Sequence, residues 1–120
     1  MRVPEATAET RESSQTYVVR DRELTEEGCR LVVEDSRGDR ETVTLPVLPD
    51  RSAPGQLHRD GLHPLAVRLE LDRPELSASC LVRSSDGPMR VAITPATALA
   101  LCCIEGRHTI LVRRGPARSG

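Results

Sequence analysis

Hydrophobic and polar residues alternate along several short segments of the chain, and this alternation predicts β-strands. In residues 29–34 every second side chain from Cys29 onward is apolar, and residues 42–48 repeat the pattern. Because successive side chains of a strand point to opposite faces, a period of two indicates strands with one buried face. The turn residues at 35–39, with Gly38 as the position suited to positive φ, join the two segments into a predicted hairpin.

The C-terminal half of the chain contains a second set of alternating segments. Residues 65–72 predict one strand, and residues 77–84 and 89–94 flank an Asp-Gly turn at 86–87 that predicts a second hairpin. Residues 109–113 predict the last strand. The side chains expected to face inward are Val67, Leu69, Leu71, Met89, Val91, Ile93, Ile110 and Val112, and Arg90 is expected to face outward.

One short helix is expected between these strands, near residues 95–105. Pro95 is suited to the first helical turn, where its missing N–H is not needed, and Thr94 precedes it as a natural N-cap. The following residues are rich in Ala and Leu, and Gly106 is placed to end the helix. By contrast, residues 49–64 are rich in Pro and Gly, which predicts a long loop.

These elements indicate a mainly β fold, a small sandwich or barrel-like arrangement of about six to seven short strands with one short helix. We expect a single domain over residues 15–114, built from two hairpin-containing halves that the loop at 49–64 joins. Residues 1–14 are polar and lack periodicity, which predicts a disordered N-terminal arm. Residues 115–120 are expected to be a flexible basic tail.

Composition adds an expectation about assembly. The chain has no Phe or Trp, and Tyr17 is its only aromatic residue, so a thin core completed by a second copy is expected. Every basic residue other than His is Arg, a composition typical of a GC-rich, actinobacterium-like bacterial genome. The overall net charge is −1, but residues 1–60 are acidic and residues 61–120 are basic. This asymmetry indicates either an anionic partner for the C-terminal half or pairing between the two halves.

The cysteines and histidines favour no particular chemistry. No apolar leader precedes Cys29, so a cytoplasmic location with reduced thiols is expected. Cys29 and Cys80 are interpreted as buried strand residues, and the pair Cys102-Cys103 as small residues at a buried helix end, with a redox role left open. His58, His63 and His108 lack a spaced partner and are interpreted as surface residues. We expect no metal and no cofactor.

The arginines carry the functional prediction. Arg83, Arg90, Arg113 and Arg114 lie on or beside the predicted strands of the basic half and are candidates for contact with nucleic-acid phosphates. We therefore expect a small non-enzymatic regulatory module, a homodimer that binds DNA or an acidic protein partner. The alternative is a structural or protein-interaction domain that self-assembles or binds a partner by strand addition. An enzyme using the loop that carries His58 and His63 is a third hypothesis.

A resemblance to a known family agrees with the DNA-binding hypothesis. The run Met89-Arg90-Val91-Ala92-Ile93-Thr94-Pro95, followed by residues 99–112, resembles the swapped-hairpin domain of the AbrB/MazE/SpoVT regulators and antitoxins. The resemblance spans residues 80–113 and implies a dimer that brings Arg90, and with it Arg83, to DNA. The chain departs from the family pattern where Met89 replaces a Gly and where Thr94 precedes Pro95. The pattern Asp86-Gly87 to Gly106 is also similar to the bifunctional nucleases, but Thr97 stands where that family has an acid.

Overall fold

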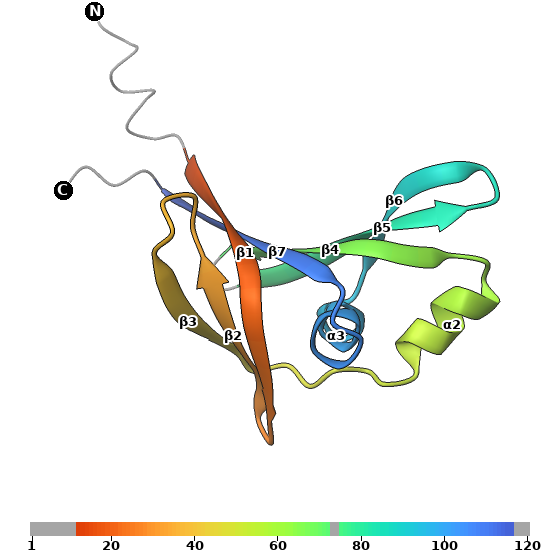
Figure 1. Ribbon diagram of the computed structural model, residues 1–120, viewed down its shortest axis with the longest axis horizontal. Helices are drawn as coiled ribbons and strands as arrows, with labels where there is room; N and C mark the ends of the chain where they lie inside the picture. The colour runs from red at the N-terminus through yellow and green to blue at the C-terminus, as the bar shows by residue number, and fades with distance from the viewer. Residues whose placement is uncertain (1–11, 73–74, 117–120) are drawn as a thin grey trace, which may run out of the picture.

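The computed structural model describes residues 12–72 and 75–116 of the chain. Over these ranges the strands form a single mixed sheet of seven strands in the order β3-β2-β1-β7-β4-β5-β6, and two short helices pack against one of its faces (Figure 1). The mainly β fold class is therefore confirmed, and the strands form one open sheet. The strands are β1 (Glu12–Thr25), β2 (Gly28–Glu34), β3 (Arg40–Leu45), β4 (His63–Asp72), β5 (Glu75–Ser84), β6 (Gly87–Ile93) and β7 (His108–Pro116).

The two predicted hairpins form as β2–β3 and β5–β6, and their predicted inner faces are buried except on β6, where Val91 and Ile93 are only half-buried. Strands β2 and β3 pair antiparallel with Leu31 opposite Val43, and both side chains lie in the core. Strands β5 and β6 pair antiparallel around the Asp86-Gly87 turn, with the buried Cys80 opposite the half-buried Val91. Strand β4 pairs with β5 on its other side, with Val67 opposite Cys80, and Val67 is also buried. Period-two alternation predicted these faces because each of these strands has one solvated side.

Strand β7 joins the two halves of the sheet. It pairs antiparallel with β1 and parallel with β4, so it is the central strand. The prediction that Ile110 and Val112 face inward was wrong, because Thr109 and Leu111 occupy the helix-covered face and both are fully buried. Val112, on the other face, is buried as well. Because this central strand is apolar on both sides, its apolar and polar residues do not alternate, and the sequence does not show which face is covered by the helices.

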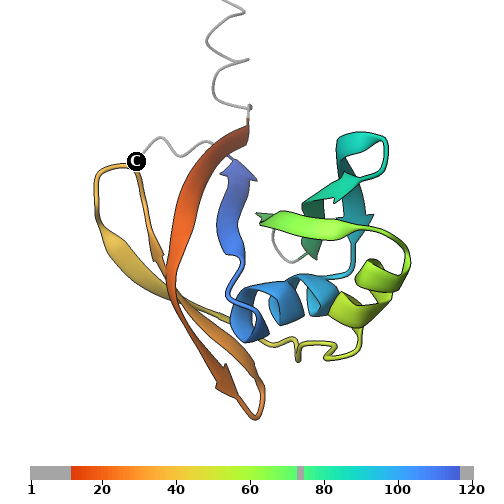
Figure 2. The ribbon, with the colours of Figure 1, turned by 45° about the vertical axis from the view of Figure 1, so that its right-hand side comes forward.

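The helices lie beneath the sheet and complete the core. They are α2 (Ala53–Arg59) and α3 (Pro95–Leu99), and α3 continues directly into a π-helical turn, η1 (Ala100–Ile104). The predicted helix near residues 95–105 is thus present, and the Thr94 hydroxyl caps it by accepting the Thr97 N–H at 3.1 Å. Figure 2 shows α3 and η1 running under the sheet, with α2 beside them.

Three predicted boundaries are corrected. The predicted loop at 49–64 contains α2, a helix that its Pro54-Gly55 sequence conceals, and the first residues of β4. Residues 12–14 of the predicted arm belong to β1, which pairs with β7 there. Residues 115–116 of the predicted tail belong to β7. The rest of the predicted arm and tail, residues 1–11 and 117–120, lies outside the described residues.

The outer strands leave two edges of the sheet open. Strand β6 ends the sheet on one side and β3 on the other. Met89 points to the helix-covered face as predicted, opposite Val82, but it is 46% exposed because no strand lies beyond β6. No helix in the described part of the chain is long and apolar enough to cross a membrane.

Candidate anion-binding site on the open face of the sheet

Strands β4, β5 and β6 present a polar face on the side away from the helices. In their register Arg68 lies opposite Ser79, and Arg90 lies opposite Leu81. Residues opposite one another on antiparallel strands point to the same side, so these residues share one face with Arg83, two positions along β5 from Leu81. The alternate side chains of the same strands fill the core, which holds the arginines outward.

A shallow hollow of about 120 Å³ lies on this face. The Arg90 guanidinium reaches across β5 and donates a hydrogen bond from Nη1 to Ser79 Oγ at 3.2 Å, which directs it towards Arg68 on the next strand. Arg68, Arg90 and His108 line the hollow together with the apolar Ala66 and Ile110, among others. Two guanidinium groups and an imidazole around a small hollow are suited to a singly or doubly charged oxyanion such as a phosphate group.

The same face of β4 and β5 also carries the carboxylates of Glu70, Asp72 and Glu75, which balance part of this charge. Arg68 Nε donates to Glu70 Oε2 at 2.7 Å, and Arg114 Nη2 lies 3.0 Å from Glu70 Oε1. Arg68 therefore offers only its terminal amino groups to a ligand. Within residues 12–72 and 75–116, neither Arg83 nor Arg90 forms an ion pair.

The four arginines predicted from the sequence do not form one surface. Arg83 and Arg90 lie together on the open face, and Arg114 lies on the same face of β7 but is bound to Glu70. Arg113 points to the opposite face, where its Nη2 donates to Glu41 Oε2 at 2.7 Å and its guanidinium lies 5.2 Å from the centre of the Tyr17 ring. Arg113 is therefore a structural residue here.

Sequence reasoning missed Arg68 and His108, which line the hollow. The alternation of residues 65–72 predicts that Arg68, between the inward Val67 and Leu69, points outward, but nothing along the chain relates it to Arg90. The register of β4 against β5 and of β5 against β6 supplies that relation. His108 lines the hollow because β7 pairs parallel with β4 and places His108 beside Ala66.

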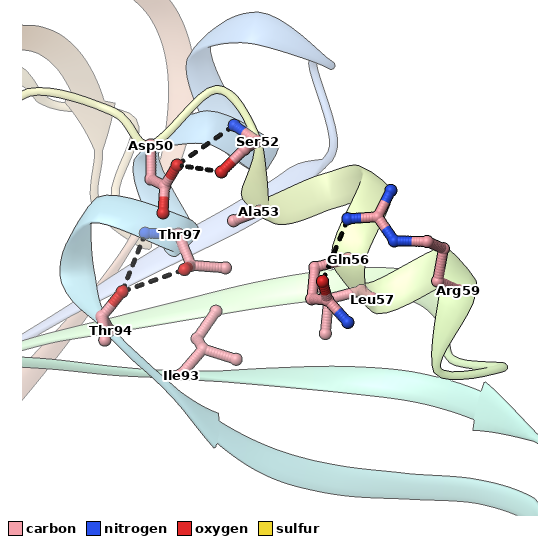
Figure 3. A pocket seen from close by; sticks show the side chains of 9 residues that line it. All are labelled: Asp50, Ser52, Ala53, Gln56, Leu57, Arg59, Ile93, Thr94 and Thr97. Atoms are coloured by element: carbon pink, nitrogen blue, oxygen red, sulfur yellow. Dashed lines mark hydrogen bonds between the residues drawn. The ribbon is translucent and has the colours of Figure 1, made fainter.

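A second hollow lies between the two helices. It measures about 370 Å³, and Figure 3 shows that its polar side chains bind one another. Asp50 Oδ1 accepts from the Ser52 hydroxyl at 2.7 Å, which lowers the pKa of this carboxyl together with the Ser52 backbone N–H. Arg59 donates to Gln56 at 3.0 Å. Because these groups already have partners, the hollow offers a ligand little unsatisfied polarity.

A third hollow, of about 580 Å³, contains two of the three histidines. The rings of His58 and His63 pack edge to face with their centres 5.4 Å apart, and Glu105 nearby is bound to Arg107 at 3.2 Å. Over the described ranges, no three His, Cys, Asp or Glu side chains are grouped so as to hold a metal ion. The open face of the sheet thus remains the strongest candidate for binding.

Comparison with known protein families, with curated proteins and with solved structures found no match for this chain.

Proposed function

We propose that the protein is a small non-enzymatic regulatory module that binds DNA through phosphate contacts on the open face of the sheet. The observation that carries this proposal is the convergence of Arg68 and Arg90, from neighbouring parts of two strands, on a phosphate-sized hollow. Arg83 extends the same basic face towards the turn of the β5–β6 hairpin. The planar guanidinium groups suit bidentate contact with phosphate oxygens.

The position of these arginines also suits the shape of a duplex. Strands β5 and β6 form a hairpin at one edge of the sheet (Figure 1). A two-stranded ribbon is narrow enough to follow or enter a DNA groove. Phosphate contacts fix the position of a protein on DNA without reading its sequence, so this face alone supports binding of low sequence selectivity.

A titration of fluorescent duplex DNA, read by anisotropy at several salt concentrations, tests the proposal. Arg90→Ala and Arg83→Ala should each weaken binding, and each should lower the slope of log affinity against log salt by about 1, because one phosphate contact is lost. Arg37→Ala is the matched control, since Arg37 is 76% exposed on the β2–β3 turn, remote from the open face. The proposal would be refuted if the wild type did not bind DNA, or if all three variants bound DNA as the wild type does.

The edge of β6 supports a second candidate function, assembly by strand addition. Its core-facing side chains Val91 and Ile93 are only half-buried, and Met89 is 46% exposed. A strand from a second copy or from another protein would cover them and pair with the free backbone of β6. If two copies paired antiparallel along β6 about an axis normal to the sheet, both arginine faces would lie on one side. The expected homodimer and the DNA-binding face are therefore compatible.

Ala92→Pro separates the two functions. Ser84 and Gly87 close the β5–β6 turn as partners, and in such a hairpin the backbone N–H groups alternate in direction along the strand. The N–H of Ala92 then points away from β5, on the same side as that of Arg90. Proline there removes a donor needed by an added strand and spares the ladder to β5. Light scattering on a sizing column should show a dimer for the wild type and a monomer for this variant. Assembly that Ala92→Pro leaves unchanged would exclude the β6 edge.

A further inference from the structure

Two histidines lie against each other where helix α2 ends and strand β4 begins. His58 is in the last turn of α2, and His63 is the first residue of β4. Their ring centres are 5.4 Å apart, and the ring planes are inclined by 70°. Both residues are exposed, and both line the hollow of about 580 Å³ beside α2. Each imidazole is therefore open to a ligand that enters the hollow from solvent.

The turn between α2 and β4 brings the two histidines together. The Gly61 N–H bonds to the His58 carbonyl at 3.0 Å. The Leu62 N–H bonds to the Leu57 carbonyl at 2.9 Å. With Gly61 at a φ of +78°, this pair of hydrogen bonds is the Schellman motif that ends a helix. Leu57 and Leu62 both pack against the hydrophobic core, so the turn is anchored from beneath, and His63 follows it directly.

The backbone on both sides of the pair is fixed by hydrogen-bonded structure. His63 pairs with Arg83 in the β4–β5 ladder, and His58 belongs to α2. Only the side-chain torsions of the two histidines remain free to adjust to a ligand. A site whose backbone is already in place loses less conformational freedom when it binds, which favours binding.

The separation of the rings is close to that of two imidazoles bound to one metal ion. With Zn–N distances of about 2.0–2.1 Å in a tetrahedral site, two bound imidazoles have their ring centres about 5 Å apart. The rings of His58 and His63 are separated by 5.4 Å. Rotation of the two rings would therefore direct one nitrogen of each towards a shared ion. Imidazole nitrogen is a preferred ligand of Zn²⁺, Cu²⁺ and Ni²⁺.

The charged groups that line the same hollow are bound to each other. Arg107 Nε donates to Glu105 Oε1 at 3.2 Å, so this pair brings little net charge to the hollow. In the part of the chain that the structure describes, no third His, Cys, Asp or Glu completes a metal-binding group with the two histidines. A metal ion here would therefore keep water in its remaining coordination positions, as ions do in sites with open positions.

We propose that His58 and His63 form a binding site for a divalent transition-metal ion, with water as the other ligands. One ring nitrogen of each histidine donates its lone pair to the ion, which links the last turn of α2 to the start of β4. Affinity should rise from Co²⁺ through Ni²⁺ to Cu²⁺ and be lower for Zn²⁺ than for Cu²⁺. Mg²⁺ and Ca²⁺, which prefer oxygen ligands, should not bind at the site.

Isothermal titration calorimetry on the full chain tests the proposal, after treatment with a chelator and with a phosphine reductant present. The wild type should bind Zn²⁺ and should not bind Mg²⁺. His58→Gln and His63→Gln should each weaken Zn²⁺ binding by about tenfold or more, because one of two protein ligands is lost. Both positions are exposed, so glutamine should leave the fold intact. His108→Gln is the matched control, since His108 is also exposed but lines the hollow on the open face, and it should bind Zn²⁺ as the wild type does.

NMR of the imidazole nitrogens distinguishes this site from zinc bound by the cysteines, whose thiolates are also zinc ligands. Addition of Zn²⁺ should shift the ring nitrogen signals of His58 and His63 and leave those of His108 in place. Zinc held by thiols would shift neither His58 nor His63. That result would overturn the proposal, and so would a wild type that binds no Zn²⁺ or an affinity that both glutamine variants leave unchanged. None of these outcomes depends on DNA binding.

Discussion

Arg113 Nη2 and Glu41 Oε2 lie 2.7 Å apart, although their strands β7 and β3 are separated in the sheet by β1 and β2. In a flat sheet two intervening strands would hold these side chains well beyond contact, since neighbouring strands lie about 4.8 Å apart. The contact therefore shows that the N-terminal half of the sheet curls strongly towards its helix-covered side. Tyr17 on β1 lies beneath the Arg113 guanidinium and supports the same curvature.

Removing this contact should destabilise the fold. Arg113→Ala is expected to lower the free energy of unfolding by about 1–2 kcal/mol, because it removes a partly buried ion pair and a cation–π contact. Urea denaturation followed by circular dichroism measures the loss. Glu41→Gln, which keeps the Tyr17 contact, should cost less than Arg113→Ala, and Arg37→Ala should change little because its carboxylate neighbours lie at 3.8 and 3.9 Å on an exposed turn. Equal losses in all three variants would contradict this account.

Gly28 should tolerate no side chain. A Cβ at this position would lie 2.0 Å from the backbone oxygen of Leu45 and 2.9 Å from the Val47 nitrogen, so β2 and β3 would have to separate locally. We expect Gly28→Ala to reduce the free energy of unfolding by up to about 3 kcal/mol. Gly55→Ala is the matched comparison, since its Cβ would meet only the end of the Arg59 side chain at 3.5 Å. Alanine within helix α2 should stabilise the protein by about 0.5–1 kcal/mol. Thermal unfolding measures both effects, since the melting temperature should fall for Gly28→Ala and rise for Gly55→Ala.

The N-cap of α3 should be measurable in the same way. Thr94 Oγ1 accepts the Thr97 N–H, and the helix that it starts places the buried Ala98 and Leu99 under the sheet. Thr94→Ala is expected to cost about 1 kcal/mol, because the N–H loses its acceptor. Thr94→Ser keeps the hydroxyl and should retain most of the stability. If serine and alanine proved equally destabilising in urea, the methyl group rather than the cap would be the cause.

The shifted pKa values of the four cysteines predict that the stability of the fold depends on pH under reducing conditions. The pKa of Cys102 is lowered to about 6 in the folded protein, so above this value the folded state has released a proton that the unfolded thiol still holds. Stability should therefore rise with pH from about 6 towards the pKa of an ordinary thiol, roughly 8.5. The pKa values of Cys29, Cys80 and Cys103 are raised instead, so their contribution is lost when the pH passes that of an ordinary thiol. We expect a maximum in the weakly alkaline range, measured as the urea midpoint against pH. Cys102→Ser should lack the rise.

The fold class and most strand faces could be predicted from the sequence, and the failures have physical causes. Alternation identified the inner faces of β2, β3, β4 and β5, because those strands have one wet side. It misassigned Ile110 and Thr109 on β7, because a central strand is apolar on both faces. Helix α2 was missed, because Pro54 and Gly55 are typical loop residues, and the helix depends on the burial of Ala53 and on the packing of Leu57 against the core.

The candidate site was only partly predictable. Arg83 and Arg90 belong to one hairpin, so local spacing placed them together. Arg68 lies near them only because of the pairing of β4 with β5, which the local sequence does not show. Arg113 does not lie near them, because its position on β7 directs it to the opposite face of the sheet. Single-sequence reasoning has no access to such long-range pairings.

The central place of β7 also constrains the order in which the protein can be made. Residues 108–116 leave the ribosome after every other strand in the described ranges, yet they alone connect β1 with β4. Until then the nascent chain holds two hairpin groups with unpaired inner edges, each a template for non-native pairing. Completion of the sheet is consequently a single late step that closes both edges at once. A ribosome that pauses before residue 108 would expose the chain to aggregation for as long as the pause lasts.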